Sequence, residues 1–335
     1  MRRILALVIL LLATPLAAAP IERVDSVAIT VADMDRALAF YTGVLAFEEV
    51  AESEVAGEAY ERLFGVFGLR ARIARLRLGE QEIELIDYLA PEGRPIPADS
   101  RSNDEWFQHI AIIVADMDRA YALLRQNNVQ HASSGPQTLP DWNPNAAGIK
   151  AFYFKDPDGN HLEILQFPPD KGAAQWHRPS DALFLGIDHT ALVVRDTAPE
   201  LAFYQGVLGL EQHGRSENYG TEQEHLNNVF GARLLITSLG AAAGPSVEFL
   251  DYLAPATGRP TPVDTQANDL WHWHVTMATR DLAALETRLR AAGATFVSPG
   301  VVEMPDDDLH LGQALMARSP SGHAILAYQP KLPSG

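Results

Sequence analysis

The chain has 335 residues, of which 47% are hydrophobic and 21% are charged, and its formal net charge is −17 at pH 7. This composition is typical of a globular protein of about two domains, and the acidic balance argues against a nucleic-acid partner, which would need clustered Lys and Arg. Cysteine is absent from the sequence, which excludes disulfides, thiolate metal sites and lipid attachment through a cysteine.

The first predicted element is an export signal over residues 1–19. Two arginines precede an apolar run from Ile4 to Leu16, and small residues follow it. The run is shorter than the ~20 residues that a membrane-spanning helix needs. We therefore expect a cleaved signal peptide, a periplasmic or secreted mature protein, and no membrane association after cleavage.

The rest of the chain is a duplication. Residues 39–45, AFYTGVL, return at 202–208 as AFYQGVL, and residues 87–91, DYLAP, return unchanged at 251–255. A fainter repeat within each half matches 27–37 to 110–120. Self-similarity at a period of about 165 residues predicts stacked supersecondary units, here four modules.

Each module is expected to begin with a β-branched strand and continue into a capped helix. Asp33, Asp116 and Asp196 occupy the capping position in the first three modules. In the first module we expect a helix over 34–45. Three further strands should follow it, near 47–52, 70–78 and 80–88. The element order is therefore β-α-β-β-β, four times, in an α+β fold.

Proline and glycine mark the joints between the modules. Stretches rich in them lie at 90–104 and 254–269, and a third lies between the halves. We expect one two-module domain over 22–168, a linker over 169–185 and a second two-module domain over 186–330.

Paired βαβββ modules, with the turn DPDGN at 156–160 leading into a strand at 162–164, resemble the vicinal oxygen chelate superfamily. This superfamily includes glyoxalase I, extradiol ring-cleaving dioxygenases and bleomycin-binding proteins. The resemblance implies open, cleft-bearing β-barrels with helices outside. It also implies a divalent metal in the cleft, held by side chains from the first and last strands of the paired modules.

The resemblance assigns two ligand positions to each module, one on the first strand and one on the last. In chain order these positions hold Ser26 and Glu84, His109 and Glu163, His189 and Glu248, and His274 and Leu326. Serine and leucine stand where a metal ligand is expected, so two of the eight positions have lost it.

The way in which the modules pair determines what these losses mean. If modules pair within each half, each of two sites is one ligand short. If they pair across the halves, as in fused double-length glyoxalases, His109, Glu163, His189 and Glu248 form a complete set. Ser26, Glu84, His274 and Leu326 then form a degenerate second site. We favour the second pairing, because one intact site is easier to maintain than two incomplete ones.

Two histidines and two carboxylates suit one divalent metal, which could be Zn, Ni, Co, Mn or Fe(II). The resemblance then implies a glyoxalase-like isomerase or lyase acting on a small molecule with vicinal oxygens. Glu163 is the first candidate for the catalytic base, with Glu248 opposite it. Possible substrate contacts are His272, Trp142 and Asn143.

Two other functions stay open. An extradiol dioxygenase would use histidines from the third and fourth modules and a glutamate from the last strand, where Leu326 stands. A non-catalytic protein would sequester a small molecule in the cleft. The sequence predicts a monomer or a homodimer, and the usual glutathione-binding residue types are sparse, with only Lys150, Lys155 and Asn143 near the second module.

Overall fold

The structure is a computed structural model and describes residues 20–305 and 309–331. The expected signal peptide, residues 1–19, lies outside the described residues. Among the described residues, no helix is both long and apolar enough to cross a membrane.

The first and third modules have the same element order. The first consists of β1 (Ile21–Val31), α1 (Met34–Gly43), β2 (Glu48–Ala56), α2 (Glu58–Phe64), β3 (Arg70–Leu78) and β4 (Gln81–Ala90). The third consists of β10 (Phe184–Val194), α4 (Thr197–Tyr204), β11 (Glu211–Tyr219), α5 (Thr221–Asn227), β12 (Arg233–Gly240) and β13 (Ser246–Ala254). The helix α1 ends two residues earlier than predicted, and the short helices α2 and α5 were not predicted.

The second and fourth modules are shorter. The second consists of β5 (Gln108–Val114), α3 (Met117–Gln126), β6 (Gln130–His131), β7 (Gln137–Thr138), β8 (Lys150–Lys155) and β9 (His161–Gln166). The fourth consists of β14 (Trp273–Thr279), α6 (Leu282–Ala291), β15 (Thr295–Phe296), β16 (Val302–Glu303), β17 (Gln313–Arg318) and β18 (Ala324–Gln329). The linker contains a 3-10 turn, η1 (Ala174–His177).

Aspartate caps the helix that follows the first strand of every module. The side chains of Asp33, Asp116, Asp196 and Asp281 each accept a hydrogen bond from a backbone N–H in the first turn. The three predicted caps are confirmed. These bonds satisfy amides that have no partner inside the helix, so each helix begins at a defined residue.

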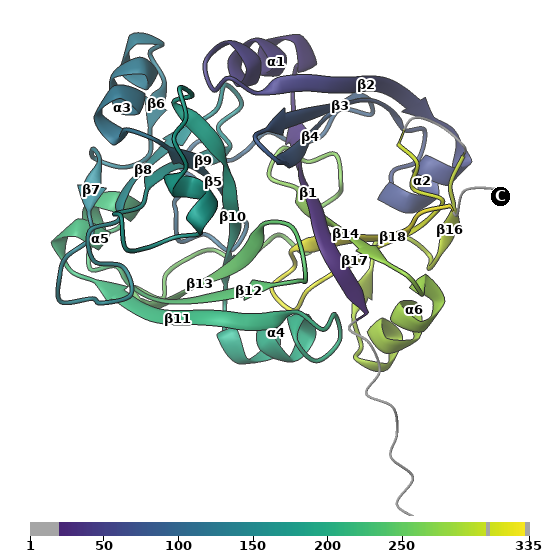
Figure 1. The fold of residues 1–335 in the computed structure, drawn as a ribbon. Coiled ribbons are helices and arrows are strands. Elements are labelled where there is room, and N and C mark those ends of the chain that lie inside the picture. The colour runs from purple at the N-terminus through teal and green to yellow at the C-terminus, as the bar shows by residue number, and fades with distance from the viewer. Residues whose placement is uncertain (1–19, 306–308, 332–335) are drawn as a thin grey trace, which may run out of the picture.

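The modules pair across the halves of the chain. β1 pairs with β14 and β5 with β10, both antiparallel. One open sheet, which we call the 1–4 sheet, has the order β2-β3-β4-β1-β14-β18-β17-β15, and the other, the 2–3 sheet, has the order β11-β12-β13-β10-β5-β9-β8-β6. Figure 1 shows them as two lobes side by side. The favoured pairing is confirmed, together with the α+β fold and its open, cleft-bearing sheets.

Alternation along the central strands gives each sheet two different faces. Ile110 and Ile112 of β5 join Val27 and Ile29 of β1 in one buried cluster between the lobes. Successive side chains of a strand point to opposite faces. His109, next to Ile110, therefore points into the concave face of the 2–3 sheet.

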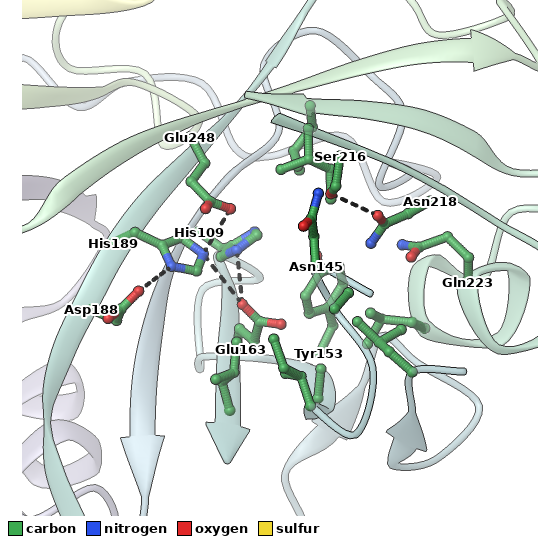
Figure 2. Close-up of a pocket in the computed structure, with 18 of the residues that line it drawn as sticks. His109, Asn145, Tyr153, Glu163, Asp188, His189, Ser216, Asn218, Gln223 and Glu248 are labelled. Atoms are coloured by element: carbon green, nitrogen blue, oxygen red, sulfur yellow. Dashed lines mark hydrogen bonds and ion pairs between the residues drawn. The ribbon is translucent and has the colours of Figure 1, made fainter. Parts of the chain in front are cut away.

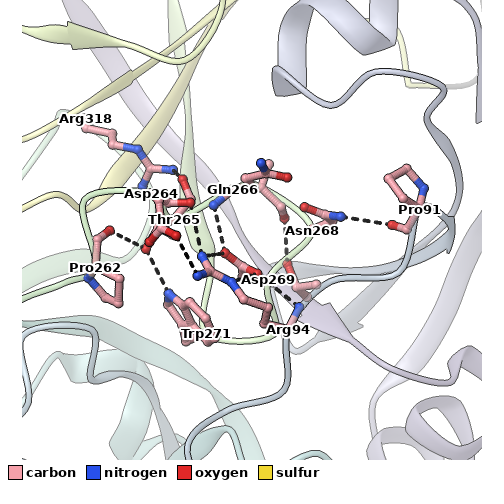
Figure 3. Close-up of polar contacts among 12 residues, drawn as sticks. Pro91, Arg94, Pro262, Asp264, Thr265, Gln266, Asn268, Asp269, Trp271 and Arg318 are labelled. Carbon is pink, nitrogen blue, oxygen red and sulfur yellow. Dashed lines mark hydrogen bonds and ion pairs between the residues drawn. The ribbon is translucent and has the colours of Figure 1, made fainter.

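Two matching loops fasten the lobes together. Arg94, in the loop after the first module, forms an ion pair with Asp269 at 2.6 Å and lies over the ring of Trp271, 4.8 Å from its centroid (Figure 3). Arg259, in the loop after the third module, pairs with Asp104 at 2.6 Å in the same way. Each loop leads from one lobe to the other, so these ion pairs hold the two connecting loops against each other.

Candidate metal centre

The 2–3 sheet brings its four predicted ligands into one cluster. His109 and His189 lie on the central strands β5 and β10, and Glu163 and Glu248 lie on the flanking strands β9 and β13. Ala111 of β5 lies opposite His189 and beside Glu163. Ala191 of β10 lies opposite His109 and beside Glu248. The duplicated modules thus place the ligands with approximate twofold symmetry.

Three of the four side chains meet closely. Glu163 Oε2 lies 3.2 Å from His109 Nε2 and 3.7 Å from His189 Nε2 (Figure 2). One ligand atom from each of these three residues lies within 4.8 Å of the other two, and all three residues are buried. Glu248 Oε2 is 3.4 Å from His189 Nε2 and stands at the edge of the group.

The donor set fits a divalent metal. Both ring nitrogens of His109 are buried, and neither makes a well-aligned hydrogen bond to a described residue, although Nε2 lies 3.2 Å from Glu163 Oε2. A buried polar atom without a partner is destabilising, and coordination at one nitrogen would satisfy it. Imidazole nitrogen and carboxylate oxygen are ligands that Zn, Ni, Co, Mn and Fe(II) all accept.

The carboxylates of the cluster favour a charged His189. Burial lowers the pKa of His189, but Glu248, Asp188 and Glu163 outweigh it and raise this pKa to about 10. Burial also raises the pKa of Glu248, against the opposing effect of His189. His274, in the 1–4 lobe, has a lowered pKa instead, because burial brings it to about 3. The surroundings of His189 thus favour positive charge, and those of His274 disfavour it.

Two supporting residues were missed by sequence reasoning. Asp188 Oδ2 accepts a hydrogen bond from His189 Nδ1 at 3.0 Å, and its Oδ1 accepts one from Trp176 Nε1 at 2.8 Å. This arrangement leaves Nε2 of His189 directed at Glu163. Comparison of the repeats could have identified Asp188, because Asp25 precedes Ser26 as Asp188 precedes His189. Trp176 lies in the linker and could not have been identified this way.

The cluster opens into a cavity of about 150 Å³. Across the cavity lie the polar side chains of Asn145, Ser216, Asn218 and Gln223 (Figure 2). Gln223 Oε1 is buried without a hydrogen-bond partner in the described part of the chain. Neither lysine nor arginine is among the described residues that line the cavity. Apolar side chains, among them Leu139, Ile149, Leu226 and Leu250, form much of the remaining lining. This lining suits a small, neutral molecule with both polar and apolar parts.

The predicted substrate contacts differ in position. Trp142 stacks on Tyr219 with ring centroids 4.2 Å apart, and Asn143 Nδ2 donates to Asn218 Oδ1 at 2.7 Å. Both contacts fasten the loop before β8 over the cavity, which Asn145 of the same loop lines. His272 lies instead in the 1–4 lobe, 5.9 Å from His274 between ring centroids.

The 1–4 sheet reproduces the arrangement without the ligands. Ser26 lies opposite Thr276, which neighbours Leu326, just as His189 lies opposite the neighbour of Glu163. Ser26 Oγ donates to Glu84 Oε1 at 2.9 Å. His274 and Glu84 both neighbour Ala28 in the sheet, as His109 and Glu248 neighbour Ala191, but only Glu84 of the two lines the cavity of this lobe.

Family models agree with this architecture. Two models of the Glyoxalase/Bleomycin resistance protein/Dioxygenase superfamily match residues 23–164 and 188–309. The chain belongs to this superfamily. It is 37% identical over 150 residues to 2-epi-5-epi-valiolone epimerase from Actinomyces sp, an alignment covering 43% of this chain and 79% of the relative. It is 27% identical over 120 residues to the uncharacterized protein YwbC of Bacillus subtilis (strain 168), covering 36% of this chain and 81% of YwbC.

Solved superfamily structures share the whole fold. Glyoxalase I from Zea mays superposes with a TM-score of 0.59 at 14% identity, covering 92% of each chain. A putative dioxygenase from Bacillus subtilis superposes with a TM-score of 0.58 at 15% identity, covering 95% of this chain and 87% of that one. At this identity the likeness concerns the fold alone.

Proposed function

We propose that the 2–3 lobe binds one divalent metal through His109, Glu163 and His189 and catalyses proton transfer on a small molecule with vicinal oxygens, as a glyoxalase-like isomerase or lyase. The buried cluster of these three side chains carries the proposal. A divalent cation there would stabilise negative charge on two adjacent substrate oxygens.

The geometry favours different roles for the two glutamates. The Glu163 side chain is 5% exposed and lies close to both histidines, which suits a ligand. The Glu248 side chain is 21% exposed and lies close to His189. We therefore assign the base to Glu248 rather than to Glu163, the first candidate from sequence.

Glu248 would remove a proton from the carbon beside the substrate carbonyl. As the C–H bond breaks, its electron pair forms a carbon–carbon double bond and the carbonyl becomes an enolate oxygen. In a hydroxy ketone the hydroxyl on the first carbon then gives its proton to the enolate oxygen. The first carbon's oxygen becomes the new carbonyl as the double-bond electron pair takes the proton back from Glu248 at the former carbonyl carbon, which completes an isomerisation. The Actinomyces relative is named as an epimerase, and epimerisation beside a carbonyl begins with the same proton removal.

The lining of the cavity favours a neutral substrate over an anionic thiol conjugate. Asn145, Asn218 and Gln223 offer amide groups to hydroxyl and carbonyl oxygens. Lys150, a candidate for binding an anionic tripeptide, lines a different cavity beside the linker. We infer a small hydroxy ketone as the substrate class.

The dioxygenase alternative has less support. Its ligand pattern needs histidines from the third and fourth modules in one cleft. His189 lies in the 2–3 sheet and His274 in the 1–4 sheet, so the pairing divides that set between two lobes.

Metal analysis with matched variants tests the site. The purified mature protein is expected to hold about one metal ion per chain. His109→Ala should lose it, and His274→Ala, at the equivalent position of the other lobe, should retain it. Equal metal content in the two variants would refute the assignment.

Proton exchange tests the chemistry. Metal-loaded protein in D₂O is expected to exchange the proton beside the carbonyl of dihydroxyacetone or 2-hydroxycyclohexanone, followed by NMR. Glu248→Gln should retain the metal and slow the exchange by about 10²–10⁴-fold. Metal binding without exchange on a wider panel of hydroxy ketones would indicate a binding protein instead.

We also propose that the protein is exported. The two arginines, apolar run and small residues of positions 1–19 support this. N-terminal sequencing of the protein from a periplasmic or culture fraction tests it, and a chain that still begins at Met1 in the cytoplasm would contradict it.

A further inference from the structure

The 1–4 lobe retains a cavity although it has lost two ligands. Its volume is about 290 Å³, larger than the 150 Å³ of the cavity at the metal cluster. Phe64, Ile73, Leu311 and Leu326 give it an apolar wall. Leu326 therefore replaces a ligand with a surface that can pack against a hydrocarbon body.

The same cavity is acidic. Among the described residues that line it are the carboxylates of Asp25, Glu80, Glu82 and Glu84 and one cation, Arg75. Asp25 is partly neutralised outside the cavity by its ion pair with Arg23. Even so, negative charge exceeds positive charge, so an anionic ligand is disfavoured and a cation is attracted.

Two unsatisfied polar groups are particular to this lobe. Arg75 lies opposite Glu84, where the 2–3 sheet has Ser238 opposite Glu248. Its Nε is buried and makes no hydrogen bond within the described ranges. Thr276 is only 3% exposed and its Oγ1 also lacks a described partner. Both groups line the cavity, and both can donate to an oxygen atom.

We propose that the 1–4 cleft is a metal-independent binding site for a small organic ammonium ion that carries a hydroxyl or carbonyl oxygen and an apolar body. The ammonium group lies among the carboxylates of Glu80, Glu82 and Glu84. The ligand oxygen accepts hydrogen bonds from Arg75 Nε and Thr276 Oγ1. The apolar body packs on the hydrophobic wall. This site is separate from the metal cluster and does not rest on the function proposed for it.

Three compounds with one carbon skeleton test the charge requirement. They are 2-amino-1-phenylethanol, a cation at pH 7, 1-phenylethane-1,2-diol, which is neutral, and mandelate, an anion. Isothermal titration calorimetry of the full chain should show the cation binding about tenfold or more tighter than the diol, and no binding of mandelate. Excess EDTA and His109→Ala should leave the affinity for the cation unchanged.

Variants locate the site. Glu82→Gln should weaken binding of the cation about tenfold and leave binding of the diol unchanged, because it removes one cleft charge. Thr276→Val should weaken both compounds. Glu49→Gln, an exposed change on β2, is the matched control and should change neither. Unchanged thermal unfolding of Glu82→Gln shows that the variant is folded.

Four results would overturn the proposal. They are mandelate binding as tightly as the cation, equal affinity of wild type and Glu82→Gln for the cation, loss of binding with EDTA, and no binding of the cation at millimolar concentration.

Discussion

Metal binding by the 2–3 lobe should depend steeply on pH. The carboxylates around His189 raise its pKa to about 10, so at neutral pH this histidine carries a proton that a metal must displace. At pH 7 the competition weakens binding by about 10³-fold, or about 4 kcal/mol, because each pH unit below the pKa corresponds to about 1.4 kcal/mol. An unperturbed histidine, with a pKa near 6.5, would impose almost no penalty at that pH.

The direction of the pH dependence follows from the proton that the metal displaces from His189. Metal affinity should rise about tenfold per pH unit from about pH 7 to 9.5 and level off above 10. In the metal-free protein the stability contribution of His189 runs the other way. Because its folded-state pKa is raised, that contribution is fully present below about pH 6.5 and is lost as the pH rises through about 10.

Calorimetry measures the displaced proton directly. Titration of metal into the metal-free protein at pH 7.5, in two buffers of different ionisation enthalpy, should show about one proton released per metal bound. Competition with a chromophoric chelator gives the pH dependence of the affinity. No proton release, with an affinity that is flat above pH 7.5, would refute this reasoning. His274→Ala should behave as wild type.

Two further substitutions test the support of the site and of the fold. Asp188→Asn removes the carboxylate that orients His189 and should lower metal affinity about 10–100-fold when measured above about pH 10, where proton competition at His189 has levelled off; Asp25→Asn, its counterpart in the other lobe, should not, as chelator competition would show. Arg94→Ala leaves the buried carboxylate of Asp269 unpaired and should lower the free energy of unfolding by about 2 kcal/mol in a urea titration, since solvent screens the half-exposed arginine. Arg77→Ala, which breaks an exposed pair, should change it by less than about 1 kcal/mol.

Local features were predictable because they depend on neighbours in the chain. An aspartate before an apolar helical stripe caps a helix wherever the module sits, and the caps at Asp33, Asp116 and Asp196 are confirmed. The repeat also allows equivalent positions to be compared within one chain, and with the ligand positions that the resemblance implies, this comparison shows Ser26 and Leu326 where ligands are expected.

The same repeat could have revealed more. Aspartate precedes the ligand position in both the first and third modules, and Asp188 contacts His189 in the structure. Trp176, which holds the other oxygen of Asp188, could not be found this way. It comes from the linker, whose path across the lobe depends on how the domains pack.

The sequence by itself determined four βαβββ modules and their capped helices, because strand alternation, helix capping and repetition are local properties of the chain; the eight ligand positions were implied by the resemblance to the superfamily. Tertiary structure alone decided which modules share a sheet. Either pairing satisfies the same local patterns, and the choice depends on contacts between residues far apart, such as Arg94 with Asp269 and β5 with β10. That choice gathers His109, Glu163 and His189 in one cleft and leaves the other lobe with an acidic cleft in which two ligand positions are lost.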